Sequence, residues 1–407
     1  SQSYFFPAFN MQRIPMQSEQ IQTYSQRYLP AMHAYQDELL QRLALLVNID
    51  SGTTQVEGVN RIMAYLEEWL TEMGMTVTLH TSEGFGNNLV ARVQGNGKAR
   101  LLLVGHVDTV YSQGAVEKQP FRIHEGLAYG PGVIDMKSGV LQTVYAVRAL
   151  LEADFREFQE LCIVFNNDEE VGSIGSAALI RDIAKHVDAA FVLEASRSLE
   201  IITKSRKGTD KYILEIDGVP AHSGAEPHKG RSAVIELAHK MIAIHNLNTL
   251  FPGVTFNVTR LSSSEPLNVV PFSARCHISV RSYTEQGLHS AATALEQIAA
   301  GRNVPDTHAR LIRSRGRTPY VATPEILQLV TLAQEEGKAL SLALTAESKG
   351  GLSDANLLME CGVPVLDSLG PVGGGMHDIA REHLRVDSLP LRGALLAGLI
   401  QHYCLSK

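Results

Sequence analysis

A histidine and an aspartate lie two residues apart directly after an apolar run. The letters GHVD at 105–108 follow Leu101–Val104, which has the composition of a buried strand. His106 is therefore expected at the carboxyl end of a strand, where open α/β sheets bind ligands. Asp108 is near enough to orient the imidazole, and such a carboxylate fixes the tautomer of a metal-binding histidine. A lone His-x-Asp pair is usually an ordinary surface loop, so the pair gains meaning only from the segments that follow.

A glycine-rich loop, GPGVIDMK at 130–137, carries Asp135 into a predicted helix. Asp135 could cap that helix, or it could offer its two oxygens to two cations. Because the loop lacks the GxxxxGK pattern, it does not predict a phosphate site.

A third segment, NNDEEVG at 166–172, follows the apolar run Leu161–Phe165. Adjacent residues of an extended chain point in opposite directions. Of the neighbours Glu169 and Glu170, one can therefore bind a metal ion while the other holds a water, as metal-assisted hydrolysis requires.

Two further ligand types complete the set. Glu194 follows the apolar run Ala189–Leu193, and His377 follows three glycines at 373–375. Two histidines with three carboxylates suit a pair of zinc ions that share one carboxylate. The candidate ligands are His106, Asp135, Glu170, Glu194 and His377.

The elements that must position these side chains alternate between strands and helices. Apolar runs at 101–104, 161–165, 189–193 and 363–366 alternate with helical patterns such as 137–151 and 173–183. This order predicts an α/β fold with a mainly parallel sheet covered by helices on both faces. Ahead of it we expect a loosely packed lead-in over 1–30, a helix after Pro30 through Leu46, and a helix from about Gln55 to Gly74 with a period of 3.6 residues.

Residues 207–315 follow a different pattern. Alternating stretches at 210–217 and 273–281, with helical patterns at about 231–247 and 284–300, give the order of a ferredoxin-like α+β unit. We therefore expect an inserted unit at 207–315 between two parts of a catalytic domain, at 1–206 and 316–407.

The chain resembles a family of zinc metallopeptidases that includes bacterial glutamate carboxypeptidase, acetylornithine deacetylase, succinyl-diaminopimelate desuccinylase and aminoacylase. The likeness runs from about residue 40 to the end and is greatest to glutamate carboxypeptidase. Besides Glu194 and His377, the segments that carry it are GHVDTV at 105–110, GPGVIDMKSG at 130–139, NNDEEVGSIGS at 166–176, GVPAHSG at 218–224, LNVVP at 267–271, GRTP at 316–319 and GGLSDAN at 350–356.

The resemblance implies two zinc ions per chain, which Co²⁺ can replace, and a role for each candidate residue. It implies that Asp135 bridges the ions and that the bond from Asp135 to Met136 is cis. His106 and Glu194 would complete the shell of one ion, and Glu170 and His377 that of the other. Glu169 would be the general base, and Asp108 would support His106.

The resemblance also implies that the inserted unit is a lid and forms a homodimer. His222 would then reach the reacting carbonyl of the partner subunit. Asn268 and Arg317 would hold the carboxylate of the substrate, with Arg315 as an alternative to Arg317, and Gly351 would lie beside the substrate.

Two departures leave the substrate open. Leu352 replaces a glycine of the turn at 350–352, and Lys349 adds a charge before it. The expected activity is hydrolysis of an amide next to a free carboxylate, with release of a C-terminal amino acid from a small peptide. The alternatives are a deacylase of N-acyl amino acids, a non-catalytic metal- or peptide-binding protein, and a structural dimer module.

Charge, cysteine spacing and hydropathy give no support for a nucleic-acid-binding protein, a cysteine zinc site or a membrane protein. The net charge of −7 gives no reason to expect nucleic-acid binding. The four cysteines are too far apart to predict a cysteine zinc site. No apolar run is long enough for a membrane span, and residues 1–20 lack the order of a signal peptide, so a soluble protein of the cytoplasm or periplasm is expected.

Overall fold

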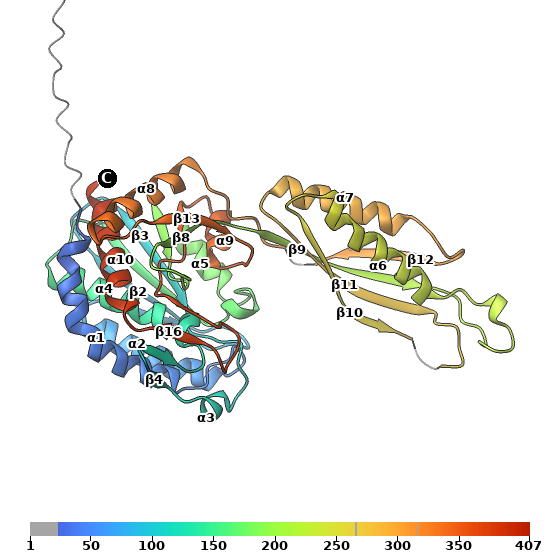
Figure 1. The fold of residues 1–407 in the computed structure, drawn as a ribbon, viewed down its shortest axis with the longest axis horizontal. Helices are drawn as coiled ribbons and strands as arrows, with labels where there is room; N and C mark the ends of the chain where they lie inside the picture. Colours follow the sequence, from blue (N-terminus) through green and yellow to red (C-terminus); the bar gives the residue numbers. More distant parts are fainter. Residues whose placement is uncertain (1–22, 265–266, 315) are drawn as a thin grey trace, which may run out of the picture.

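A six-stranded sheet forms the centre of the larger part of the molecule (Figure 1). The structure is a computed structural model and describes residues 23–264, 267–314 and 316–407. Strands β6, β3, β7 and β14 pair in parallel, whereas β2 pairs antiparallel with both β1 and β6. In spatial order the strands are β1 (Thr76–His80), β2 (Asn88–Gln94), β6 (Glu160–Asn166), β3 (Arg100–His106), β7 (Ala189–Val192) and β14 (Val365–Leu366).

Alternate residues of β2, β6, β3, β7 and β14 belong to two different hydrophobic cores. Leu101 and Leu103 of β3 face one core, and Leu102 and Val104 face the other. Because both faces are covered, the strands are continuous apolar runs in the sequence, and the predicted mainly parallel sheet is confirmed. The first core lies under α1 (Ser25–Val47), α2 (Val56–Glu72), α4 (Ser138–Glu152), α8 (Pro324–Ala339) and α10 (Ser388–Leu405), and the second under α5 (Ala177–Ala184) and α9 (Asp354–Glu360).

The first helix begins earlier than predicted. α1 starts at Ser25, so the expected lead-in is wrong for the part of it from Ser25 to Pro30, while residues 1–22 lie outside the described residues. Pro30 lies inside this helix, where it removes one helical hydrogen bond and crowds the carbonyl four residues earlier. The start of α1 is instead fixed by a distant carboxylate, since Glu336 accepts hydrogen bonds from the backbone N–H groups of Tyr24 and Ser25 at 3.0 and 2.7 Å.

The inserted unit is a four-stranded antiparallel sheet with two helices, and it projects from the rest of the molecule (Figure 1). Its sheet order, β10-β11-β9-β12, confirms the predicted ferredoxin-like arrangement. The elements in chain order are β9 (Gly208–Asp217), α6 (Ala233–Leu250), β10 (Thr255–Ser263), β11 (Ser273–Ser282), α7 (Glu285–Ala300) and β12 (His308–Arg313).

Two smaller sheets complete the fold. One contains β15 (Gly373–Gly374), β16 (His383–Arg385), β5 (Leu127–Tyr129) and β4 (Arg122–His124). The other pairs β13 (Thr345–Lys349) with β8 (Ile201–Arg206). Of the helices formed by the described residues, none has both the length and the apolar character needed to cross a membrane.

Candidate metal centre

Three adjacent parallel strands bring candidate ligands to one edge of the central sheet. β3 lies between β6 and β7 and ends at His106. β6 ends at Asn166, shortly before Glu169 and Glu170, and β7 ends at Val192, shortly before Glu194. Since the carboxyl ends of parallel strands meet at one edge, side chains far apart in the sequence converge there.

The sheet of β4, β5, β15 and β16 brings the other two ligands to the same edge. β5 leads into the loop that carries Asp135, and β15 leads into the loop that carries His377. β16 pairs with both β5 and β15, so the two loops leave the same small sheet. The Asp135–Met136 peptide bond is cis.

The five predicted ligands form two groups that share Asp135. In the first, His106 Nε2 lies 3.2 Å from Asp135 Oδ1 and 3.7 Å from Glu194 Oε1. In the second, His377 Nε2 lies 3.1 Å from Asp135 Oδ2 and 3.5 Å from Glu170 Oε2. The two oxygens of one carboxylate therefore face two separate groups of potential ligands.

Asp108 supports this arrangement from a fully buried position. Its backbone carbonyl is the hydrogen-bond partner of His106 Nδ1 at 3.0 Å, and one carboxylate oxygen lies 3.3 Å from the same atom, on the side of the ring away from Asp135. Its carboxylate also accepts hydrogen bonds from the backbone N–H groups of Glu169 and Glu170, at 3.1 and 3.2 Å. Asp108 thus fixes both the imidazole and the turn that presents the two glutamates.

Crowded carboxylates dominate the electrostatics of the site. Burial, followed by repulsion from Asp135, raises the pKa of Glu194 to about 8. Burial also raises the pKa of Glu169 well above its ordinary value, with Glu194 adding to the effect. The hydrogen bonds that His377 donates to Asp135 and Glu170 raise its pKa to about 10. These shifts indicate a site with an excess of negative charge, which a cation would relieve.

The donor set fits zinc. Nε2 of His106 is buried and makes no hydrogen bond to any residue that the structure describes. Its ring is held through Nδ1, which leaves Nε2 directed at Asp135 and Glu194 as a ligand atom. One imidazole and two carboxylates in each group match a catalytic zinc site with a position left for water.

Glu382 is a part of the site that the sequence analysis missed. It is fully buried, and its carboxylate accepts hydrogen bonds from the backbone N–H groups of Gly132, Ile134 and Asp135 at 3.0–3.2 Å. The hydroxyl of Tyr111 donates to it at 2.6 Å. Glu382 thereby joins the Asp135 loop to the segment after His377. The only sequence signal is an acidic residue shortly after a candidate histidine, which is too common to single out.

His222 and Asn268 do not lie with the ligands. The backbone N–H of Ser223 donates to the carbonyl of Asn268 at 2.9 Å, and His222 forms a β-bridge with Val269. Both candidate residues are exposed. The segment between β9 and α6 lies at the end of the inserted unit that is far from the central sheet (Figure 1).

Arg317 and Gly351 lie closer to the centre. Arg317 donates a hydrogen bond through Nη2 to the carbonyl of Gly172, just beyond the Glu169–Glu170 turn. Its Nη1 is buried and has no hydrogen-bond partner among the described residues. The carbonyl of Gly351 accepts from Arg206 at 3.1 Å. The alternative, Arg315, lies outside the described residues.

Comparison with known proteins identifies the family. Residues 102–402 match peptidase family M20/M25/M40. The chain belongs to this family. It is 32% identical over 369 residues to carboxypeptidase G2 from Pseudomonas sp. (strain RS-16), covering 90% of this chain and 89% of that protein. It is 30% identical over 344 residues to succinyl-diaminopimelate desuccinylase from Xanthomonas oryzae pv. oryzae (strain PXO99A), covering 79% and 88%.

Solved structures share the fold. Aminopeptidase PepT from Bacillus cereus superposes with a TM-score of 0.79 at 21% identity, over 91% of this chain and 99% of that one. The M20 metallo-carboxypeptidase Sso-CP2 from Sulfolobus solfataricus has a TM-score of 0.70 at 15% identity, over 91% and 100%. The predicted resemblance is confirmed, and the chain is a zinc-dependent hydrolase of the M20 family. The non-catalytic alternatives are therefore set aside.

Proposed function

We propose that this M20 hydrolase holds two zinc ions and releases a C-terminal amino acid from a small peptide by hydrolysis of the amide next to the free carboxylate. The observation that carries the proposal is the position of Asp135, whose two oxygens face two ligand groups 3.1–3.2 Å away, with Glu169 beside them. The similarity to carboxypeptidase G2 over 90% of the chain supports a carboxypeptidase.

In the proposed site, His106, Asp135 and Glu194 hold one ion and Asp135, Glu170 and His377 hold the other. Bound zinc supplies a water acidified toward a pKa of about 7 and polarises the amide carbonyl. Glu169, with Oε2 4.0 Å from His106 Nε2, takes the proton of the attacking water. It then delivers that proton to the leaving amine, so the same side chain acts first as general base and then as general acid.

The carboxylate of the leaving amino acid is assigned to Arg317, with Gly351 beside the substrate. The buried and unpaired Nη1 of Arg317 supports this role, because an unpaired buried donor is costly until a ligand occupies it. A guanidinium can also bind a carboxylate through two parallel hydrogen bonds.

The inserted unit acts as a lid in the proposed enzyme and forms a homodimer. His222 and Asn268 of the partner subunit would then complete the site. β10 is an edge strand with unpaired backbone groups, and such edges pair readily with another chain. On α6, Ile235 and Ile242 are 51% and 63% exposed and lie two turns apart on one face. Exposed apolar groups beside a free strand edge favour an interface at this place.

A deacylase of N-acyl amino acids is the second candidate, because succinyl-diaminopimelate desuccinylases are also 26–30% identical to this chain. The two candidates share the zinc site and differ only in the acyl group that they accept.

The test of the proposed function is a metal titration of the protein after chelation. Activity on an N-acyl-glutamate should return as zinc is added and reach its maximum near two equivalents per chain, with Co²⁺ able to replace zinc. Full activity at one equivalent would contradict the shared Asp135. If the protein released no C-terminal amino acid at any metal content, the proposed carboxypeptidase activity would be wrong.

Substrate preference should depend on Arg317. Replacing Arg317 by alanine should weaken transition-state binding of substrates with a free α-carboxylate by about 2 kcal/mol, roughly 30-fold in kcat/KM. Arg317→Lys is the matched control, because lysine keeps the charge but cannot form the two parallel hydrogen bonds. Its kcat/KM should lie between those of the wild type and Arg317→Ala. Substrates amidated at that carboxyl should be poor for the wild type and unchanged by the substitution. Equal kcat/KM on the acid and the amide would remove Arg317 from this role.

A further inference from the structure

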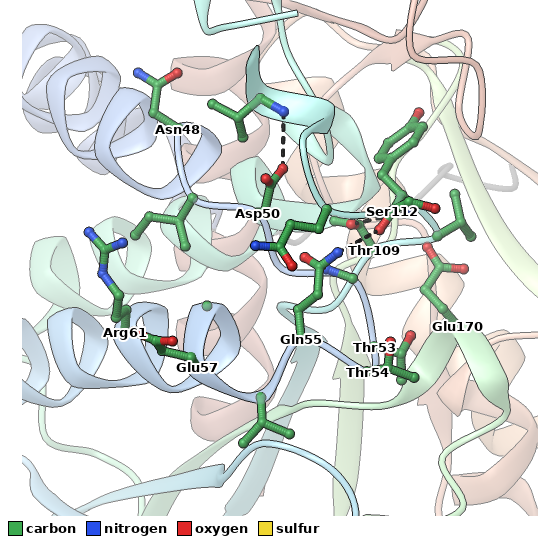
Figure 2. A pocket seen from close by; sticks show the side chains of 18 of the residues that line it. Asn48, Asp50, Thr53, Thr54, Gln55, Glu57, Arg61, Thr109, Ser112 and Glu170 are labelled. Atoms are coloured by element: carbon green, nitrogen blue, oxygen red, sulfur yellow. Dashed lines mark hydrogen bonds between the residues drawn. The ribbon is translucent and has the colours of Figure 1, made fainter. Parts of the chain in front are cut away.

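A polar groove begins at the second ligand group and leads away from it. It has a volume of about 990 Å³ and is lined by residues of the segments 48–61, 109–117 and 170–171. Figure 2 shows Glu170 at one end of the lining and Glu57 and Arg61 at the other. We call this cavity the side groove.

The walls of the side groove are held in place by their own hydrogen bonds. Thr53 N donates to Thr109 O at 3.2 Å, and Thr109 N donates to Ser51 O at 2.9 Å, so the two walls are joined along its floor. Gly52 permits this close approach, since a Cβ there would lie 2.2 Å from the carbonyl of Tyr111. The groove is therefore a preformed cavity of the size that binds small ligands.

The position of the groove relative to Arg317 assigns the part of the substrate that enters it. This step rests on the proposed function. The turn at 169–172 separates the two sites, because Glu170 and Val171 line the groove while Gly172 O accepts from Arg317. If the leaving amino acid lies toward Arg317 and the scissile carbonyl lies at the ligand groups, the acyl part continues into the groove.

Negative charge predominates along the side groove. Its lining holds the carboxylates of Asp50, Glu57 and Glu117 and one cation, Arg61, in addition to Glu170 itself. The carboxylate of Asp50 is fixed by the backbone N–H groups of Gly114 and Val116, at 2.7 and 3.0 Å. Arg61 forms no ion pair with any residue that the structure describes, so it does not neutralise one of these carboxylates. The carboxylates therefore act on any group that enters the groove.

We propose that the side groove is the acyl-side subsite and that it selects acyl groups that carry an amino group, as in a peptide with a free N-terminus, over acyl groups that end in a carboxylate. An amino group within a Debye length of about 10 Å is attracted by the lining, and a carboxylate is repelled. Acyl groups as small as acetyl would leave most of the cavity unfilled.

The experiment uses three N-acyl-glutamates of equal length, in which the acyl chain ends in an ammonium, a methyl or a carboxylate: 4-aminobutanoyl-, pentanoyl- and glutaryl-glutamate. The zinc-loaded enzyme should show kcat/KM falling in that order, by about tenfold in total at low ionic strength, which is the scale of a few exposed charge interactions. Added salt should compress the range because the charges are exposed to solvent.

A double variant, Glu57→Gln with Glu117→Gln, locates the origin of the preference. It should compress the range to less than about threefold, since it removes two of the charges that the substrate meets. Glu68→Gln is the matched control. Glu68 is an exposed carboxylate on α2, the helix that carries Glu57, but it does not line the groove. It should retain the wild-type range.

The outcomes separate this inference from the proposed function. Hydrolysis of none of the three substrates would overturn both. Hydrolysis of all three at equal rates, or fastest for the glutaryl substrate, would overturn the inference and leave the carboxypeptidase intact. A preference for the ammonium that the double variant keeps in full would also overturn it, because the selectivity would then come from another surface.

Discussion

Replacing Glu169 by glutamine should lower kcat by a factor of about 10³ while both zinc ions stay bound. Glutamine keeps the size of the side chain but cannot accept the proton of the attacking water. Glu169 lies beside His106, with Oε2 4.0 Å from Nε2, but neither ligand group includes it. The measurement is kcat on an N-acyl-glutamate together with the zinc content of the same preparation.

Glu170→Gln is the matched control for Glu169→Gln. Glu170 belongs to the group of Asp135 and His377, with Oε2 3.5 Å from His377 Nε2. The loss of its charge should therefore lower the zinc content as well as kcat. Asp108 accepts the backbone N–H of both residues, so the turn is held in the same way in either variant. If Glu169→Gln lost zinc and Glu170→Gln did not, the two roles would have to be exchanged.

The sequence singles out the candidate ligands because each follows a buried strand or a glycine-rich loop. His106 and Glu194 come at the ends of apolar runs, and the parallel order of β3 and β7 alone is enough to bring them together. Asp135 and His377 are different, since their proximity depends on the small sheet of β5, β15 and β16, whose strands are too short to recognise from sequence patterns.

Long-range polar contacts could not be predicted from the sequence in this way. Glu336 fixes the start of α1 from more than 300 residues away, and so the helix begins before Pro30 instead of after it. Glu382 shapes the Asp135 loop through backbone N–H groups, which every residue possesses, so the loop sequence does not reveal its partner. Local sequence patterns indicate which residues are buried and whether a segment is a helix or a strand. They do not indicate which distant groups donate hydrogen bonds to a buried carboxylate.

His222 should act on the active site of the partner subunit. It lies beside Asn268 in the segment between β9 and α6, and this segment is at the end of the inserted unit far from the central sheet (Figure 1). Its Nδ1 accepts hydrogen bonds from the backbone N–H groups of Gly224 and Ala225, at 3.2 and 3.0 Å, which leaves Nε2 to donate to an oxyanion. His222→Ala should lower kcat by a factor of about 10² to 10³, the effect of removing one oxyanion donor. His228→Ala, an exposed histidine of the same segment, should have little effect.

Mixing two inactive variants decides between action in the same subunit and in the partner. In a heterodimer of His222→Ala with Glu169→Ala, the His222→Ala chain keeps Glu169 and receives His222 from its partner, so one of its two sites is whole. Random exchange makes half of the dimers heterodimers, and activity should therefore recover to about one quarter of wild type. If His222 served its own subunit, the Glu169→Ala chain would supply its histidine to a site without a base, and both sites would stay broken. Differently tagged chains that exchange without any recovery of activity would therefore place His222 outside the partner's active site.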